Sequence, residues 1–458
     1  METRLTQSKA FKRVLVANRG EIAVRVIRAC RELGLETVQV YSEADRDSLA
    51  VRMADKAVCI GPARSRDSYL NGPFIVSAAR MHGADAIHPG YGFLSENAEF
   101  AALCEKEGVV FIGPTSRVIS LMGDKATARQ MAQDAGVPTT PGSRETLSGP
   151  QEARKVADEL GYPVLLKAAA GGGGRGMRVV WKAEELEHRY NEAAREAKSA
   201  FGNDAIYIEK FLTEVRHIEI QILSDGENVL HLGERDCSIQ RRNQKLLEES
   251  PSPVLDAGVR AEIGEAAVRL CRHVGYTSAG TIECILDAKS GKFYFMEMNT
   301  RVQVEHPVSE LVTGVDIVKE QIRIARGERL ALRQQDIEIR GHAIECRINA
   351  EDAARDFQPC PGRVDDFQAP GGPGIRVDSH LFSGYQVPPY YDSLLAKVIA
   401  WGTSREEAIA RMQRALAEMR VAGVTTTIPF HQSLLAHERF VRGDTHTKFI
   451  EQSMLEPT

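Results

Sequence analysis

The stretch YPVLLKAAAGGGGRGMRVVW (residues 162–181) decides between two fold classes. Residues 171–176 fit GxGxxG, the glycine fingerprint of a Rossmann βαβ unit. That fingerprint leads from a strand into a helix, whereas residues 177–181 have the β-branched pattern of a strand. We therefore predict a glycine loop that joins two strands and closes over phosphates with its backbone N–H groups. A flexible glycine hairpin without a ligand is the alternative.

Lys167 lies on the strand just before this loop, where its ammonium group can reach the same phosphates. The chain contains no GxxxxGK[S/T] motif, so a P-loop is unsupported. We expect phosphate groups to be bound by Lys167 together with the loop.

Outward from this stretch, the chain changes its pattern three times. Residues 1–113 alternate apolar strands with helical segments, as in a doubly wound parallel sheet, and the turn-rich loop HPGYGFLSEN (residues 88–97) follows one of the strands. A helical linker over 114–139 leads to a second unit, 140–212, which contains the glycine loop. Residues 213–458 are dominated by antiparallel strand patterns. We thus predict an α/β and α+β chain of several domains.

The composition excludes several classes of protein. Among 458 residues, 43% are hydrophobic, 26% are charged and the net charge is −5, which provides no basic surface for nucleic acid. No run of 18 apolar residues occurs and the N-terminus lacks a signal-peptide core, so we expect a cytoplasmic protein without a membrane span. The eight cysteines show no CxxC spacing and are expected to be reduced.

The segment KFYFMEMNTRVQVEHPV (residues 292–308) carries polar residues at every second position. In an extended chain these side chains share one face, with Met296, Met298, Val302 and Val304 packing on the other. A solvated strand face would alternate in the same way. The polar positions are Glu297, Asn299, Arg301, Gln303 and Glu305.

A hairpin between GTIECILD (280–287) and this segment, with its turn centred on residue 290, sets Glu283 opposite Glu297. Like charges that face each other across strands repel unless a cation lies between them. The two carboxylates and the amide of Asn299 are hard oxygen ligands, so the pattern predicts a Mg²⁺ site.

Arg301 and Glu305 suit a small planar anion that is both held and deprotonated, because a guanidinium fork binds an oxyanion and a carboxylate acts as a general base. Arg347 lies on a further strand and is either another cation of the site or a structural ion-pair partner. His217 has no second histidine at metal-ligand spacing, so a packed role and a nucleotide contact both stay open.

With these residues in place, the chain resembles the biotin carboxylase subunit of biotin-dependent carboxylases of the acetyl-CoA carboxylase type, a branch of the ATP-grasp superfamily. The resemblance runs from about Arg13 to the C-terminus. It rests on long segments: VLVANRGEIAVRVIRA, HPGYGFLSEN, MGDK, KAAAGGGGRGMRVV, EKFL, EMNTRVQVEHPVSE, GHAIECRINAED and VPPYYDSL. It implies a Rossmann-like N-terminal domain, a mobile glycine-rich ATP-grasp lid, a C-terminal catalytic domain with a mixed antiparallel sheet, and a homodimer.

The resemblance also implies roles for individual residues. ATP would be bound by Lys125, Lys167, Gly172, Gly173, Gly174, Glu209, Lys210, Leu212, His217, Gln240, Glu283 and Glu297. Mg²⁺ or Mn²⁺ would be bound by Glu283, Glu297 and Asn299. Bicarbonate would be held by Lys245, Arg301, Gln303 and the backbone of Val304 and deprotonated by Glu305, and Arg347 would stabilise the biotin enolate.

The implied reaction passes through carboxyphosphate and carboxylates biotin on a separate biotin carboxyl carrier protein. No lysine of the chain follows a methionine, so the Met-Lys biotinylation signature is absent. Carboxyltransferase subunits are the further expected partners, with acetyl-CoA and fatty acid synthesis the commonest setting and other acyl-CoA or pyruvate carboxylases as alternatives. One departure from the family pattern is Asn243, where many members have histidine.

Three rival functions stay in view. Another ATP-grasp ligase that forms carboxyphosphate would use a different acceptor. A dinucleotide-dependent oxidoreductase would need a helix after the glycine loop. A nucleotide sensor would bind ATP without bicarbonate-dependent hydrolysis.

Overall fold

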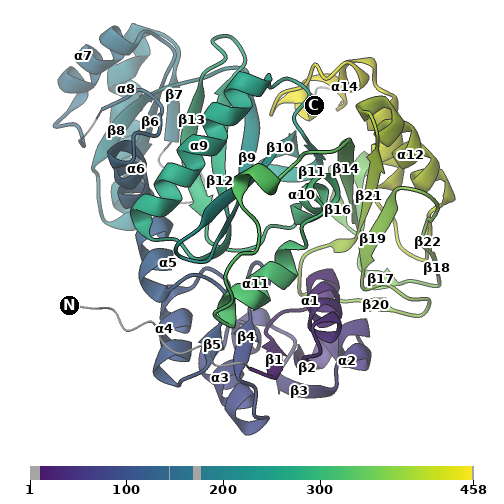
Figure 1. The fold of residues 1–458 in the computed structure, drawn as a ribbon. Coiled ribbons are helices and arrows are strands. Elements are labelled where there is room, and N and C mark those ends of the chain that lie inside the picture. The colour runs from purple at the N-terminus through teal and green to yellow at the C-terminus, as the bar shows by residue number, and fades with distance from the viewer. Residues whose placement is uncertain (1–10, 144, 169–176, 456–458) are drawn as a thin grey trace.

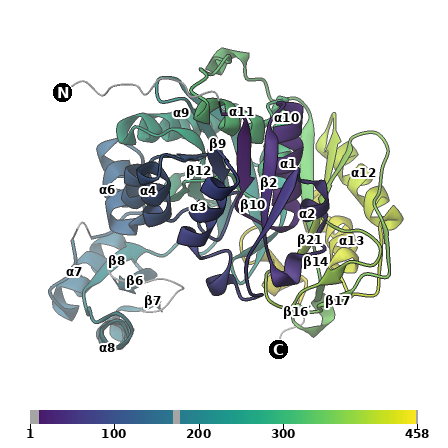
Figure 2. The same cartoon turned by 90° about the horizontal axis from the view of Figure 1, so that it is seen from below.

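The chain forms three sheet-based units (Figure 1). The structure is a computed structural model that describes residues 11–143, 145–168 and 177–455. The N-terminal unit lies at the bottom of Figure 1, a small unit projects at the upper left, and the largest sheet fills the centre and right. Seen from below, the small unit stands apart from the rest of the molecule (Figure 2).

The N-terminal unit is a parallel sheet, as the alternating pattern predicts. Its strand order is β3-β2-β1-β4-β5 and every neighbouring pair is parallel. The strands are β1 (Arg13–Val16), β2 (Glu36–Ser42), β3 (Lys56–Gly61), β4 (Ala86–His88) and β5 (Val110–Phe111). The helices are α1 (Gly20–Glu32), α2 (Leu49–Met53), α3 (Gly72–Met81) and α4 (Ala98–Lys106).

Two helices lead from this sheet to the small unit. They are α5 (Ser116–Gly123) and α6 (Lys125–Asp134), and Asp124 caps α6 through the backbone N–H of Thr127. The small unit has an antiparallel sheet of order β7-β6-β8. Its elements are α7 (Pro150–Leu160), β6 (Val164–Ala168), β7 (Met177–Val180), α8 (Leu186–Phe201) and β8 (Ile206–Lys210). The strand predicted after the glycine run is therefore confirmed.

The central sheet has eight antiparallel strands in the order β13-β12-β9-β10-β11-β14-β21-β19. These are β9 (Val215–Ser224), β10 (Val229–Arg241), β11 (Gln244–Ser250), β12 (Ser278–Asp287), β13 (Phe293–Asn299), β14 (His342–Asn349), β19 (Ile375–Ser379) and β21 (Leu394–Gly402). Around it lie α9 (Ala257–Val274), α10 (His306–Thr313), α11 (Ile317–Ala325), α12 (Arg405–Glu418), α13 (Ile428–Ala436), α14 (Glu438–Val441) and α15 (Phe449–Ser453). Short strands complete the C-terminal part: β15 (Glu351–Asp352), β16 (Gln358–Pro359), β17 (Gly362–Arg363), β18 (Asp366–Gln368), β20 (Gln386–Val387) and β22 (Arg420–Ala422).

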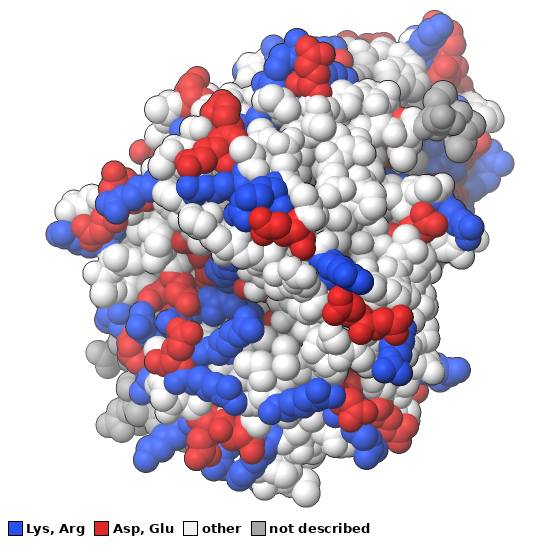
Figure 3. Space-filling model, turned by 90° about the vertical axis from the view of Figure 1, so that its right-hand side faces the viewer, with Lys and Arg blue, Asp and Glu red and all other residues white. Residues whose placement is uncertain are grey.

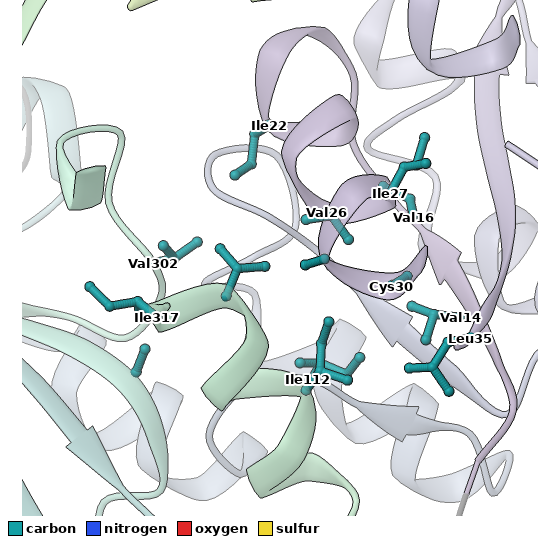
Figure 4. Close-up of a cluster of buried hydrophobic side chains, with 14 of the residues drawn as sticks. Val14, Val16, Ile22, Val26, Ile27, Cys30, Leu35, Ile112, Val302 and Ile317 are labelled. Carbon is teal, nitrogen blue, oxygen red and sulfur yellow. The ribbon is translucent and has the colours of Figure 1, made fainter. Parts of the chain in front are cut away.

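The N-terminal unit and the central sheet share one hydrophobic core. Val302, from the loop after β13, is fully buried with Ile317 of α11 and with Val26 of α1 in one cluster. Figure 4 shows Val302 and Ile317 pointing toward α1 across the boundary between the two units. This packing fixes the loop after β13 against the N-terminal unit.

The surface and the helices agree with the composition. On the face drawn in Figure 3, Lys and Arg are interspersed with Asp and Glu, so this face has no extended field of one sign. Among the described helices, none is both long and apolar enough to span a bilayer.

Candidate active site

The site lies on the polar face of the central sheet. Along β9, Ile218, Ile220 and Ile222 are buried in the core beneath α9, so the alternating residues His217, Glu219 and Gln221 point to the opposite face. Those polar side chains are also buried, with Glu219 fully inaccessible. Buried charges require partners, and the neighbouring strands supply them.

The hairpin of β12 and β13 sets Glu283 opposite Glu297, so the predicted register is confirmed. The pairing is made by a β-bulge, because Cys284 pairs with Phe295 and the ladder shifts at the next step. Met296 is the extra residue, and it lines the cleft with 41% of its surface exposed. The prediction that Met296 packs in the core is therefore wrong, since the bulge turns it to the polar face.

Lys245 of β11 is the centre of this charged cluster. Its ammonium nitrogen lies 3.0 Å from Glu283 and 2.9 Å from Glu305, and it also bonds to Glu219. Burial opposes its charge, but the three carboxylates outweigh burial and raise the pKa of Lys245 well above its usual value. Lys245 therefore stays protonated.

The residues after Asn299 form a loop and not a strand, which corrects the prediction of one extended polar face up to residue 305. Arg301 Nε donates to Glu96 of the HPGYGFLSEN loop at 2.8 Å, and the Nε2 of Gln303 donates to Glu283 at 3.1 Å. The carbonyl of Val304 accepts from Lys397 Nζ at 2.7 Å. Side chains of the predicted anion site thus converge because the loop is held on both sides.

Glu305 is the N-cap residue just before α10 and is fully buried between two cations. Its carboxylate accepts from Lys245 at 2.9 Å and from Arg347 Nη2 at 2.8 Å. Burial raises its pKa, but Lys245, Arg347 and Arg235 outweigh burial and hold the pKa of Glu305 well below its usual value. Glu305 is therefore ionised at neutral pH, as a general base must be.

A cleft of about 930 Å³ opens beside these groups. Asn243, at a positive φ of 66° in the turn from β10 to β11, and Thr447 also line it. Asparagine tolerates that left-handed conformation better than most residues. The lining of this cleft includes eight of the predicted site residues: His217, Gln240, Lys245, Glu283, Glu297, Asn299, Arg301 and Gln303.

The other predicted nucleotide ligands come from the small unit and α6. Lys167 Nζ lies 2.5 Å from Glu209, which also accepts from Arg129 at 2.6 Å. Lys125, the first residue of α6, lies 3.3 Å from Glu297 of β13. Lys210 donates to the carbonyl of Gly161 at 2.8 Å. Leu212 follows β8, whereas Gly172, Gly173 and Gly174 lie outside the described residues.

The predicted metal ligands fit a hard divalent cation. Glu283 and Glu297 present carboxylates to one cleft, and Lys125 partly neutralises Glu297. Asn299 is less available, because its Oδ1 accepts from Arg301 Nη2 at 3.0 Å and its Nδ2 donates to Glu283 at 2.7 Å. Glu283 also accepts from Lys245 and Gln303, so the partly exposed Glu297 is the most accessible of the three predicted Mg²⁺ ligands.

Family comparisons identify this arrangement. Biotin carboxylase, N-terminal domain, matches residues 10–119, carbamoyl-phosphate synthase L chain, ATP binding domain, matches 124–333, and Biotin carboxylase C-terminal domain matches 345–452. Biotin carboxylase 1 of Bacillus subtilis is 58% identical over 442 residues, which cover 96% of this chain and 98% of that protein. The chain belongs to the biotin carboxylase family.

Solved structures within the biotin carboxylase family come from different carboxylases. The biotin carboxylase subunit of pyruvate carboxylase superposes with a TM-score of 0.87 and 51% identity, over 96% of this chain and 98% of that one. The biotin carboxylase domain dimer of Hydrogenobacter thermophilus 2-oxoglutarate carboxylase, solved with MgADP, ADP and bicarbonate, superposes with a TM-score of 0.88 at 53% identity, over 96% of this chain and 97% of that one. These matches confirm the predicted ATP-grasp fold and an ATP-dependent biotin carboxylase.

Sequence reasoning missed several charged residues of this biotin carboxylase site. Glu219 accepts from Arg235 and Lys245, and Glu248 accepts from Arg347 Nε at 2.6 Å. The signal for Glu219 was present, since a charged residue between Ile218 and Ile220 must point away from the core. Glu96 gave less signal, because its contact with Arg301 joins residues 205 positions apart.

Proposed function

We propose that this biotin carboxylase binds MgATP in the cleft on the polar face of the central sheet, with the small unit contributing further contacts. Lys125 and Lys167 hold the phosphates, while Glu209, Lys210 and Leu212 line the base pocket beside His217 and Gln240. Glu283 and Glu297, with Asn299 if it is released from Arg301, hold the Mg²⁺, which neutralises phosphate charge when bound. Glycines 172–174 complete the phosphate site. The proposed domains are an N-terminal domain (1–113), a helical linker (114–139), a lid over the nucleotide (140–212) and a catalytic domain (213–458).

Bicarbonate lies between Lys245, Arg301, Gln303 and the backbone of Val304. Glu305 accepts its proton, and a bicarbonate oxygen bonds to the γ-phosphorus as the bond from that phosphorus to ADP breaks. Carboxyphosphate and ADP result. Cleavage of the carbon–oxygen bond to phosphate then gives CO₂ and inorganic phosphate, in a closed site that excludes water.

Biotin is carboxylated in the next step. The released phosphate accepts the N1′ proton, Arg347 stabilises the negative charge on the ureido oxygen, and N1′ bonds to CO₂. Arg347 suits this role because its guanidinium is fixed by two carboxylates, Glu248 and Glu305, and needs little reorganisation.

The setting of the reaction is also proposed. We expect biotin to arrive on a carrier protein and a carboxyltransferase partner to pass the carboxyl group on. We also expect this chain to form a homodimer, since the Hydrogenobacter thermophilus domain was solved as a dimer. We propose acetyl-CoA as the acceptor and fatty acid synthesis as the pathway, because these are the commonest for a separate biotin carboxylase subunit. All eight cysteines are free thiols, which supports the reducing cytoplasm as the location.

The observation that carries this proposal is Glu305, an ionised carboxylate buried between Arg347 and Lys245, of which Lys245 lines the cleft. Oxygen transfer tests it. With ¹⁸O-labelled bicarbonate, ATP and biotin, each turnover should place one labelled oxygen in inorganic phosphate. Label-free phosphate with continuing ADP release would show that water attacks ATP and would reject the carboxyphosphate route.

A further inference from the structure

The guanidinium of Arg347 is held by two carboxylates on two different elements. Glu248 of β11 accepts from Nε at 2.6 Å and lies 2.5 Å from Nη2, and Glu305 accepts from Nη2 at 2.8 Å. The backbone of Arg347 is fixed as well, because its carbonyl accepts from Thr427 Oγ1 at 3.0 Å and lies 2.8 Å from His431 Nε2 of α13. Arg347 is thus anchored at both ends.

The two carboxylates differ in what the reaction does to them. On the proposed function, Glu305 becomes neutral when it accepts the bicarbonate proton, so its bond to Arg347 loses the charge-assisted part. Glu248 has no such task. It is fully buried, and among the described residues every hydrogen bond to its carboxylate comes from Arg347.

We propose that Glu248 is the positioning residue that keeps Arg347 directed at biotin after Glu305 has taken up a proton. This inference rests on the proposed function and adds to it a residue that does not contact the reacting atoms. Without Glu248, Arg347 would be bound only to a carboxylate that loses its charge during turnover.

The surroundings of Glu248 argue against a role as an ordinary structural ion pair. Directly opposite it in the ladder lies Glu345 of β14, a second fully buried carboxyl with no hydrogen bond to either oxygen among the described residues. Two acidic groups that face each other in the core are unfavourable for stability. A carboxyl group that lowers stability and binds a single arginine is better explained by the need to fix that arginine than by a contribution to folding.

The chain provides a matched control in the next residue. Glu249 is also a buried glutamate of β11 paired with an arginine, Arg405 Nε at 2.6 Å, and with His342 at 2.8 Å. It points to the opposite face of the sheet, toward α12, where it contacts none of the proposed site residues. Glu249→Gln therefore replaces a buried, arginine-paired carboxyl group of the same strand at a distance from the chemistry.

Steady-state kinetics of bicarbonate- and biotin-dependent ADP release by the full chain tests the inference. We expect Glu248→Gln to lower kcat by about tenfold or more, because a small misplacement of a catalytic group has effects of that size, with KM for MgATP unchanged. Glu249→Gln should lower thermal stability and leave kcat unchanged. In an Arg347→Lys background, which cannot form the fork, Glu248→Gln should lower kcat by a smaller factor.

A wild-type kcat in Glu248→Gln, an equal loss in Glu249→Gln, or an undiminished loss in the Arg347→Lys background would each overturn the inference. If Glu248→Gln does not fold, Glu248→Asp retains the carboxyl group with a shorter reach, and a wild-type kcat in that variant would also overturn the inference. If the wild type itself releases no ADP in response to bicarbonate and biotin, it is the proposed function that fails.

Discussion

Glu297 differs from the other acidic residues of the cleft in being only partly buried, with 38% of its side chain exposed. Glu219, Glu283 and Glu305 are all buried and each forms an ion pair with Lys245. Glu297 is therefore the carboxylate that an incoming Mg²⁺ reaches first.

Replacing Glu297 by glutamine should raise the Mg²⁺ concentration for half-maximal ADP release by about tenfold or more, because an amide is a weaker ligand without charge. Titration of Mg²⁺ at saturating ATP measures this. Asp287→Asn, at the other end of the same hairpin, should leave the Mg²⁺ requirement unchanged. Equal requirements in Glu297→Gln and the wild type would exclude Glu297 as a ligand.

Glu249 provides a pH-dependent stability test. Burial raises its pKa, but His342 and Arg405 outweigh burial and lower it to about 2. A depressed folded-state pKa stabilises the protein above the unfolded value near 4.5, and this stabilisation is lost as the pH falls from there toward 2. Urea unfolding should show wild type more stable than Glu249→Gln by roughly 1–3 kcal/mol at pH 7, with the gap narrowing below pH 4.5. A gap that widens on acidification would contradict the assignment.

Among individual residues, the sequence predicted those site residues that lie close together in the chain. Glu283, Glu297 and Asn299 follow from one hairpin, whereas Glu96, Glu248 and Lys397 reach the site through pairings between distant strands and loops. Alternation indicates which face such a residue takes, but it does not show which residue lies opposite.

Among the elements, the segment before α7 connects the small unit to α6. Gly142 pairs with Glu209 of β8, and a Cβ at Gly142 would come within 2.3 Å of the Ile208 carbonyl. Arg129 of α6 links the same two segments, because it donates to Glu209 of β8 and to the carbonyl of Thr140, both at 2.6 Å. This connection sets where β8 lies over the cleft.

Gly142→Ala should therefore displace β8, raising KM for MgATP and speeding hydrogen exchange at the amides of β8. Gly149→Ala is the matched control, because its added Cβ meets nothing within 4 Å and its backbone is extended. Similar kinetics and exchange in the two variants would show that the close approach at Gly142 has no effect on the lid.

The β13 hairpin marks the limit of element-level prediction. Counting from the turn predicted Glu297 as the partner of Glu283, and this is the pairing observed. Near the turn, however, Cys284 pairs with Phe295, and a regular ladder continued from that pair would set Met296 opposite Glu283. The pairing with Glu297 forms only because the bulge skips Met296. Bulges depend on packing against the neighbouring sheet and carry little local sequence signal.

For the whole molecule, the cores predict how the chain unfolds. The N-terminal sheet and the central sheet share a cluster through Val302, while the small unit has a core of its own formed by Val164, Ile208 and their neighbours. Figures 1 and 2 show the same separation in space. The strand and helix patterns predicted each unit, but the shared cluster joins residues far apart in the sequence and was not predictable.

Val302→Ala should lower the free energy of unfolding by about 2 kcal/mol. It should also lower the unfolding temperature of both large sheets together. Calorimetry with circular dichroism measures it, and the small unit should retain its own transition. Val254→Ala, at a residue 45% exposed, is the control and should change little. Separate shifts of the two large sheets would contradict a shared core.

The most direct test of the account is ADP release from the purified chain with MgATP, measured with and without bicarbonate and biotin, in the wild type and in Glu305→Gln. The account predicts release that requires both bicarbonate and biotin and that falls by about 10²–10⁴-fold in the variant, the usual contribution of a general base. Release indifferent to biotin, or a variant as fast as the wild type, would contradict it.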